Sequence, residues 1–139
     1  MTNQTEDYWP SLPSTLFAGD PEPAQLLRSQ ADVLSKKTKG VVRGEVTNTA
    51  LEGTIYYSLY LGAPALGDYQ VKILDIAFPV AQTALEPFPL TANDAFGGSA
   101  QEITDKDQFE EWLKATLQSN TVLAVIGNLM KYSRPRVSK

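Results

Sequence analysis

Residues 54–61 read TIYYSLYL, and the fold class follows from this stretch more than from any other. Every second position from Ile55 to Leu61 carries an apolar or aromatic side chain, which is the period of an extended strand. The opposite face carries Tyr56, Ser58 and Tyr60, so both faces of the strand bear large side chains. Such a pattern is typical of a strand that has neighbours on both sides. The stretch therefore predicts an inner strand of a β-sheet.

The segments around this strand extend it into a sheet. Residues 41–47 alternate between the two faces and predict a strand, while residues 48–53 resemble a turn. Residues 62–68 hold two glycines and a proline and predict a loop. Residues 69–78 predict a third strand, and a change of parity between Ile73 and Leu74 indicates a β-bulge there.

The next two segments are less regular. Residues 79–91 contain three prolines, which leaves room only for a short edge strand anchored by Phe88 and Leu90. Residues 92–103, with several Gly, Asn, Asp and Ser residues, predict a mobile loop. The sequence thus predicts three to five strands, and the short connections favour antiparallel pairing.

Three helices are expected beside the sheet. Residues 21–38 have an apolar stripe, an Asp20 cap and a terminating Gly40. Residues 105–118 begin with acidic side chains that suit a helix N-terminus. Residues 121–132 are apolar nearly all round, which predicts a helix buried in this domain or against another chain.

These elements predict an α+β fold: an N-terminal helix, an antiparallel β-meander of three to five strands and a C-terminal helical pair. Residues 21–133 are expected to form its single domain. Residues 1–20 are expected to form an extended arm that packs on its own domain or docks on a partner subunit, and residues 134–139 a disordered basic tail. The predicted core comprises Leu27, Leu34, Ile55, Leu59, Ile73, Phe109, Leu113 and Ile126.

Neither histidine nor cysteine occurs among the 139 residues. The chain therefore lacks the commonest general base near neutral pH and all thiolate chemistry, and we expect no catalytic residues, no cofactor and no metal. The formal net charge of −4 argues against nucleic acid, whose binding needs clustered Lys and Arg. Without a signal-peptide pattern or a long apolar run, we expect a cytoplasmic protein that does not enter a membrane.

Acidic motifs in the second helix have ordinary structural explanations. Asp105 and Asp107 suit a helix N-terminus better than a metal site. Adjacent Glu110 and Glu111 point in different directions on a helix, so they cannot act together as acid and base on one substrate.

The candidates for a recognition surface are aromatic and apolar. Tyrosine offers large, rigid contact area and is enriched at interfaces. Alternatively, the C-terminal helices cover the tyrosine face and its hydroxyls find internal partners. The helix 121–132 presents an apolar strip if its own domain does not cover it. The candidate surface comprises Tyr56, Tyr60, Leu66, Tyr69, Leu123, Leu129 and Met130.

Three stretches carry a resemblance: LLRSQADVLSKKTKGVVRGEV, YYSLYLGAPALGDYQVKILDI and ITDKDQFEEWLKATLQSNTVLAVIGNLMKYS. Together, over about residues 21–133, they resemble a group of small bacterial cytosolic proteins of unknown function. The shared features are a loop that matches at Ala63, Pro64, Leu66 and Tyr69 and a helix break at residues 119–122. The resemblance implies a cytosolic bacterial or phage-associated protein and transfers no functional residue.

Three functional hypotheses remain open. The first is a non-catalytic interaction protein, homo-oligomeric or bound to another protein through the sheet face or the last helix; an immunity or antitoxin-like role fits by analogy, since acidic binders steer towards basic partners. The second is a small-molecule binding module with a pocket between the sheet and the C-terminal helices near Tyr56 and Tyr60. The third is an enzyme that uses only carboxylates, Lys or Tyr, which a deep polar pocket would support.

Overall fold

The computed structural model describes residues 8, 10, 11, 20–80 and 87–133. Most of the predicted arm and all of the predicted tail lie outside these residues. The elements are α1 (Glu22–Lys37), β1 (Arg43–Leu51), β2 (Thr54–Gly62), η2 (Pro64–Leu66), β3 (Gln70–Pro79), β4 (Leu90–Asp94), β5 (Gln101–Ile103), α2 (Lys106–Leu117) and α3 (Asn120–Ser133). This order confirms the α+β prediction, and the three helices lie within one or two residues of the predicted bounds.

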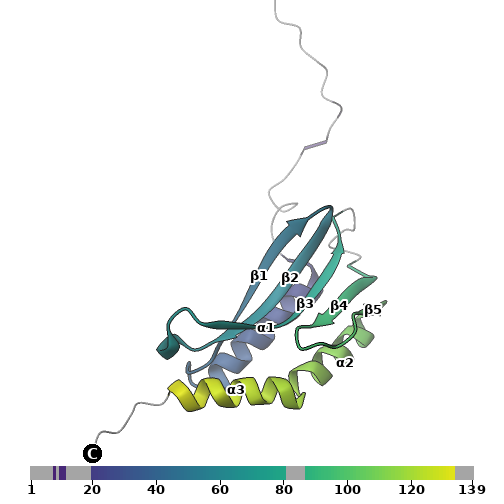
Figure 1. Ribbon diagram of the computed structural model, residues 1–139. Coiled ribbons are helices and arrows are strands. Elements are labelled where there is room, and N and C mark those ends of the chain that lie inside the picture. Colours follow the sequence, from purple (N-terminus) through teal and green to yellow (C-terminus); the bar gives the residue numbers. More distant parts are fainter. Residues whose placement is uncertain (1–7, 9, 12–19, 81–86, 134–139) are drawn as a thin grey trace, which may run out of the picture.

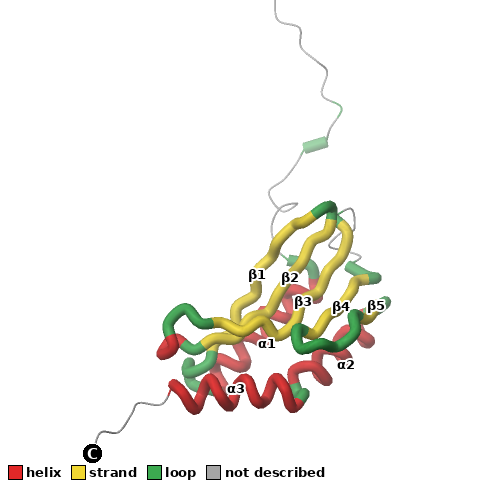
Figure 2. Tube along the Cα trace, viewed as in Figure 1, coloured by secondary structure: helices red, strands yellow, loops and turns green. Residues whose placement is uncertain are grey.

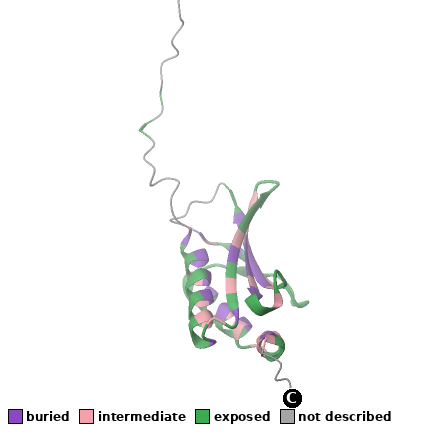
Figure 3. Ribbon diagram, turned by 90° about the vertical axis from the view of Figure 1, so that its left-hand side faces the viewer, coloured by how far each residue is buried: buried purple, intermediate pink, exposed green. Residues whose placement is uncertain are grey.

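The strands of the described chain form one antiparallel sheet of five, in the order β1-β2-β3-β4-β5. The sheet lies in front of α1 in Figure 1, with α2 and α3 along its lower part, and Figure 2 gives the same view by element type. The side view in Figure 3 shows α1 against one side of the sheet. The predicted inner strand is β2, which pairs with β1 and β3.

The core lies between this sheet and the helices. Of the predicted core residues, the following are at most 4% exposed: Leu27, Leu59, Ile73, Phe109 and Leu113. Leu34, Ile55 and Ile126 are only partly buried against the core, so their prediction was too strong. Leu34 and Ile126 line a hollow of about 140 Å³ between α1 and α3, because these helices do not close over the sheet between them.

The first hairpin is tighter than predicted. β1 continues through residues 48–51, and only Glu52 and Gly53 form the turn, with φ values of 51° and 80°. Positive φ at both positions matches the two-residue turn that joins strongly twisted antiparallel strands. The predicted turn over 48–53 contains this turn but was too long, because several residues that favour turns occur inside the strand.

The predicted β-bulge is confirmed in β3. Leu59 pairs with Leu74 and Tyr60 with Lys72, which leaves Ile73 without a partner on β2. Ile73 and Leu74 are both fully buried. The extra residue shifts the alternation of faces along β3 by one position. Residues after Ile73 therefore lie on the opposite face from the one that a regular strand would give them.

Two expectations for residues 79–103 were wrong. The strand that starts at Leu90 is not at an edge, because β5 pairs with it on its far side. Residues 92–103 are not one loop, since they include the end of β4 and all of β5. The strand β5 has only three residues, too few to show an alternating pattern in the sequence.

Buried Tyr57 belongs to the core and not to a surface site. Its ring stacks on Phe78 with centroids 5.9 Å apart. Burial, followed by the nearby Asp20 carboxylate, raises the pKa of the Tyr57 hydroxyl above its ordinary value. Arg28 pairs with Asp20 and donates to the Val46 carbonyl, which ties the start of α1 to β1.

Candidate functional site

We call the sheet face that points away from α1 the open face. The alternation of side chains and the strand register place three cross-strand rows on it. The rows are Thr49–Tyr56–Ala77–Thr91–Glu102, Thr47–Ser58–Asp75–Asn93 and Glu45–Tyr60–Lys72. Among the described elements, no helix covers this face (Figures 1 and 3).

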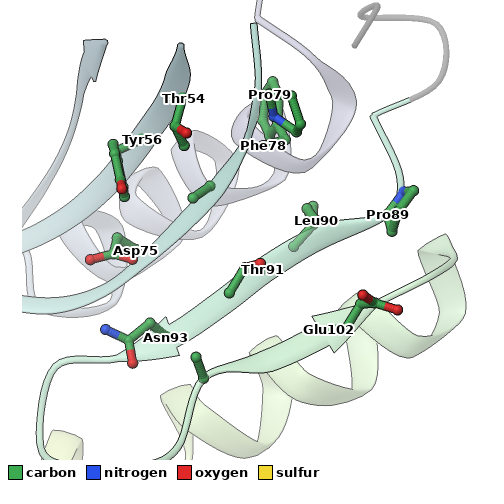
Figure 4. A pocket seen from close by; sticks show the side chains of 12 residues that line it. Thr54, Tyr56, Asp75, Phe78, Pro79, Pro89, Leu90, Thr91, Asn93 and Glu102 are labelled. Atoms are coloured by element: carbon green, nitrogen blue, oxygen red, sulfur yellow. The ribbon is translucent and has the colours of Figure 1, made fainter. Parts of the chain in front are cut away.

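A hollow of about 630 Å³ occupies part of the open face. Its polar lining comes from four strands: Thr54, Tyr56, Asp75, Thr91, Asn93 and Glu102. Its apolar lining consists of Ala77, Phe78, Pro79, Pro89, Leu90 and Ala100. Figure 4 shows these side chains around the space between β2 and β5. Phe78 and Leu90 are buried in the core, so the hollow presents hydrogen-bonding groups, the Tyr56 ring and an apolar rim of Ala77, Pro79, Pro89 and Ala100.

The carboxylate of Asp75 is the most buried charged group of the hollow. Its side chain is 12% exposed, and the Lys72 Nζ lies 2.7 Å from it. The β-bulge makes this pair possible: a regular strand would place residues 72 and 75 on opposite faces, and the extra Ile73 places both on the open face. A carboxylate this deeply buried needs such a partner, because an unpaired buried charge is costly.

The tyrosines of β2 lie on the open face, where sequence reasoning did not expect a pocket. Tyr56 lines the hollow. Tyr60 lies beyond the end of the hollow, opposite Glu45 on β1 and Lys72 on β3 in the strand register. Hollows do lie between the sheet and the C-terminal helices, as predicted, but neither Tyr56 nor Tyr60 lines them. The hollow of about 140 Å³ on the helical side is lined by Leu59 and Leu61, the strand positions of opposite parity.

The other predicted surface residues fall into separate places. Leu66, Tyr69 and Leu129 line a hollow of about 290 Å³ between η2 and α3. Leu129 is only 3% exposed, whereas Leu123 is 52% exposed on the outer side of α3. Met130 is partly buried against the core. The three α3 residues therefore do not form the continuous exposed strip that the sequence allowed.

A shallow groove of about 430 Å³ separates α1 from α2. Leu26 and Gln30 line it from α1, and Leu113, Lys114 and Leu117 from α2. No pattern in the structure indicates what covers it. It remains a surface depression beside the core.

Sequence reasoning found only Tyr56 among the polar residues of the hollow and missed Thr54, Asp75, Thr91, Asn93 and Glu102. Asp75 had a detectable signal, since it is the one acid in an apolar strand and follows the predicted bulge. Asn93 and Glu102 lay in the segment predicted as a loop. Their place in the site depends on the pairing of β4 with β3 and β5, which local patterns do not reveal.

The arrangement in the hollow is suited to recognition. Hydroxyl, amide and carboxylate groups around the Tyr56 ring offer both hydrogen-bond donors and hydrogen-bond acceptors. Within the described ranges, no three carboxylates gather to hold a metal ion. None of the described helices has both the length and the apolar character that a bilayer span requires. Comparisons with protein-family models, curated proteins and solved structures gave no match.

Proposed function

We propose that the protein is a non-catalytic binding protein that recognises a partner protein through the open face of its sheet. The observation that carries the proposal is the hollow of about 630 Å³ on a sheet face that no described helix covers. A solvated sheet face needs only polar side chains. This one also presents a half-buried tyrosine and an apolar rim, and such groups gain from removal from water at an interface.

The volume of the hollow favours a second candidate, a small-molecule binding module. Pockets for small molecules measure roughly 300–1,000 Å³, and the hollow falls in this range. However, Thr91 and Glu102 on its floor are exposed, so a small ligand would stay largely in water. Small-molecule sites bury most of their ligand. A partner protein can cover the open hollow with its own surface and exclude water from it, so a protein partner fits this shape better.

Substitution of Thr91 by Arg tests the proposal, because the exposed Thr91 side chain lines the hollow and a long side chain fills it. We expect Thr91→Arg to reduce capture of the partner from native cells by about tenfold or more. Ser29→Arg makes the same change of charge on exposed α1 and serves as the matched control. Capture is quantified by mass spectrometry, with circular dichroism to show that both variants fold.

Equal capture by the Thr91 and Ser29 variants would contradict the proposal. Loss of capture only in the Ser29 variant would assign the interface to α1 instead. Purification of the wild-type chain with a bound compound below about 1 kDa, and with no protein, would favour the small-molecule candidate.

A further inference from the structure

We propose that the hollow on the open face accepts a basic side chain of the partner, the guanidinium of an arginine or the ammonium of a lysine. This inference rests on the proposed function and adds the chemistry that the open face selects. The occupant is thus a basic segment of a partner protein. Three observations carry it: the charges in the hollow, the internal ion pair beside it and the position of the Tyr56 ring.

The charges that line the hollow are acidic. Asp75 and Glu102 are its charged lining residues, and no Lys or Arg lines it among the described residues. The ion pairs of the described residues join Arg28 to Asp20, Lys72 to Asp75 and Lys106 to Glu22, so none of them includes Glu102. The whole chain carries a formal net charge of −4. The hollow therefore attracts cations, both locally and through the long-range field.

Lys72 shows that an ammonium group can reach the buried carboxylate from the open face. It approaches from the row beyond the hollow, and its side chain is 39% exposed. A partner cation entering the hollow reaches the same carboxylate from the opposite direction. Lys72 is thus an internal competitor, and its ammonium can return to water when a partner cation takes its place.

The remaining groups suit a planar or compact cation. Asp75 on β3 and Glu102 on β5 are separated by one strand and by two residues along it, so their backbones lie about 12 Å apart. A guanidinium between them has enough donors to bond to both carboxylates. Tyr56 lines the same space, and a tyrosine ring face attracts a cation within about 6 Å of its centre.

The test measures binding of a fluorescent hexa-arginine peptide by anisotropy at low ionic strength. We expect Asp75→Asn to weaken binding by about tenfold and the more exposed Glu102→Gln by about twofold to threefold. Glu111→Gln removes the same charge from exposed α2, and it should leave the affinity unchanged. A hexa-glutamate peptide should not bind.

Lys72→Met gives the most specific result. Removal of the competing ammonium should raise the affinity for hexa-arginine by about twofold to fivefold, which is more than the loss of one positive charge from the surface would give. Lys36→Met makes the same change on exposed α1 and should raise it less. Lys72→Gln, which keeps a hydrogen-bond donor for Asp75, replaces the Met variant if that variant unfolds.

Unchanged binding in Asp75→Asn, or weaker binding in Lys72→Met, would overturn the inference. Binding of hexa-glutamate in place of hexa-arginine would do the same. The inference can fail while the proposed function holds: Thr91→Arg would still reduce partner capture, but Asp75→Asn would not weaken it. If Thr91→Arg leaves capture intact, the proposed function fails first, and this inference fails with it.

Discussion

Phe109→Ala is expected to lower the free energy of unfolding by about 3–5 kcal/mol. Phe109 is 1% exposed and is among the largest fully buried side chains of the described chain. Its ring stacks beside Trp112, with centroids 6.2 Å apart. Truncation leaves a cavity where α2 meets the sheet, and the rigid surroundings close it only in part. Urea denaturation followed by circular dichroism measures the change.

Phe96→Ala provides the control, because the same atoms are removed from a side chain that is 39% exposed. We expect a loss below about 1 kcal/mol for this variant. Similar losses at both positions would show that α2 does not pack on the sheet as described.

Gly44→Ala is expected to destabilise the protein by about 1–3 kcal/mol, although alanine normally favours a folded chain over glycine. A Cβ at Gly44 would lie 2.7 Å from the Cβ of Ala31 and 3.0 Å from its Cα. The second atom belongs to the backbone of α1, so the helix itself must move away from β1. The loss of glycine therefore separates α1 from the sheet.

The matched control is Gly127→Ala on α3, where an added Cβ meets no atom within 4 Å. That variant should gain about 0.5–1 kcal/mol, because alanine is the better helix former. Chemical denaturation of both variants, and of Gly44→Ala combined with Ala31→Gly, completes the test. Partial recovery in the double variant is expected for residues in contact, and strict additivity would contradict the close approach of α1.

The fold class was predictable because it depends on local periodicity. Alternation in β2, the stripe of α1 and the parity change at Ile73 each produced a signal that the structure confirms. The bounds of the turn at Glu52–Gly53 and the existence of the strand β5 were not predictable in this way. The former lacks the usual Asn-Gly sequence, and the latter is too short to alternate.

The candidate site was only partly predictable. Tyr56 was identified from its residue type. The sequence did not show whether its face of β2 is covered by helices or exposed to solvent, because that depends on where the helices pack. Asp75 and Glu102 meet around one hollow only after three strands have paired in register. A site of this kind arises from tertiary structure, and no spacing in the sequence records it.

The most direct test of the open face as the binding surface is photocrosslinking in native cells. A benzoylphenylalanine replaces either Thr91, in the hollow, or Lys114, in the groove between α1 and α2. We expect a covalent adduct of the chain with a second protein from position 91 and none from position 114. An adduct from position 114 alone, or a position 91 crosslink only to the chain's own residues, would contradict the proposed open-face interface.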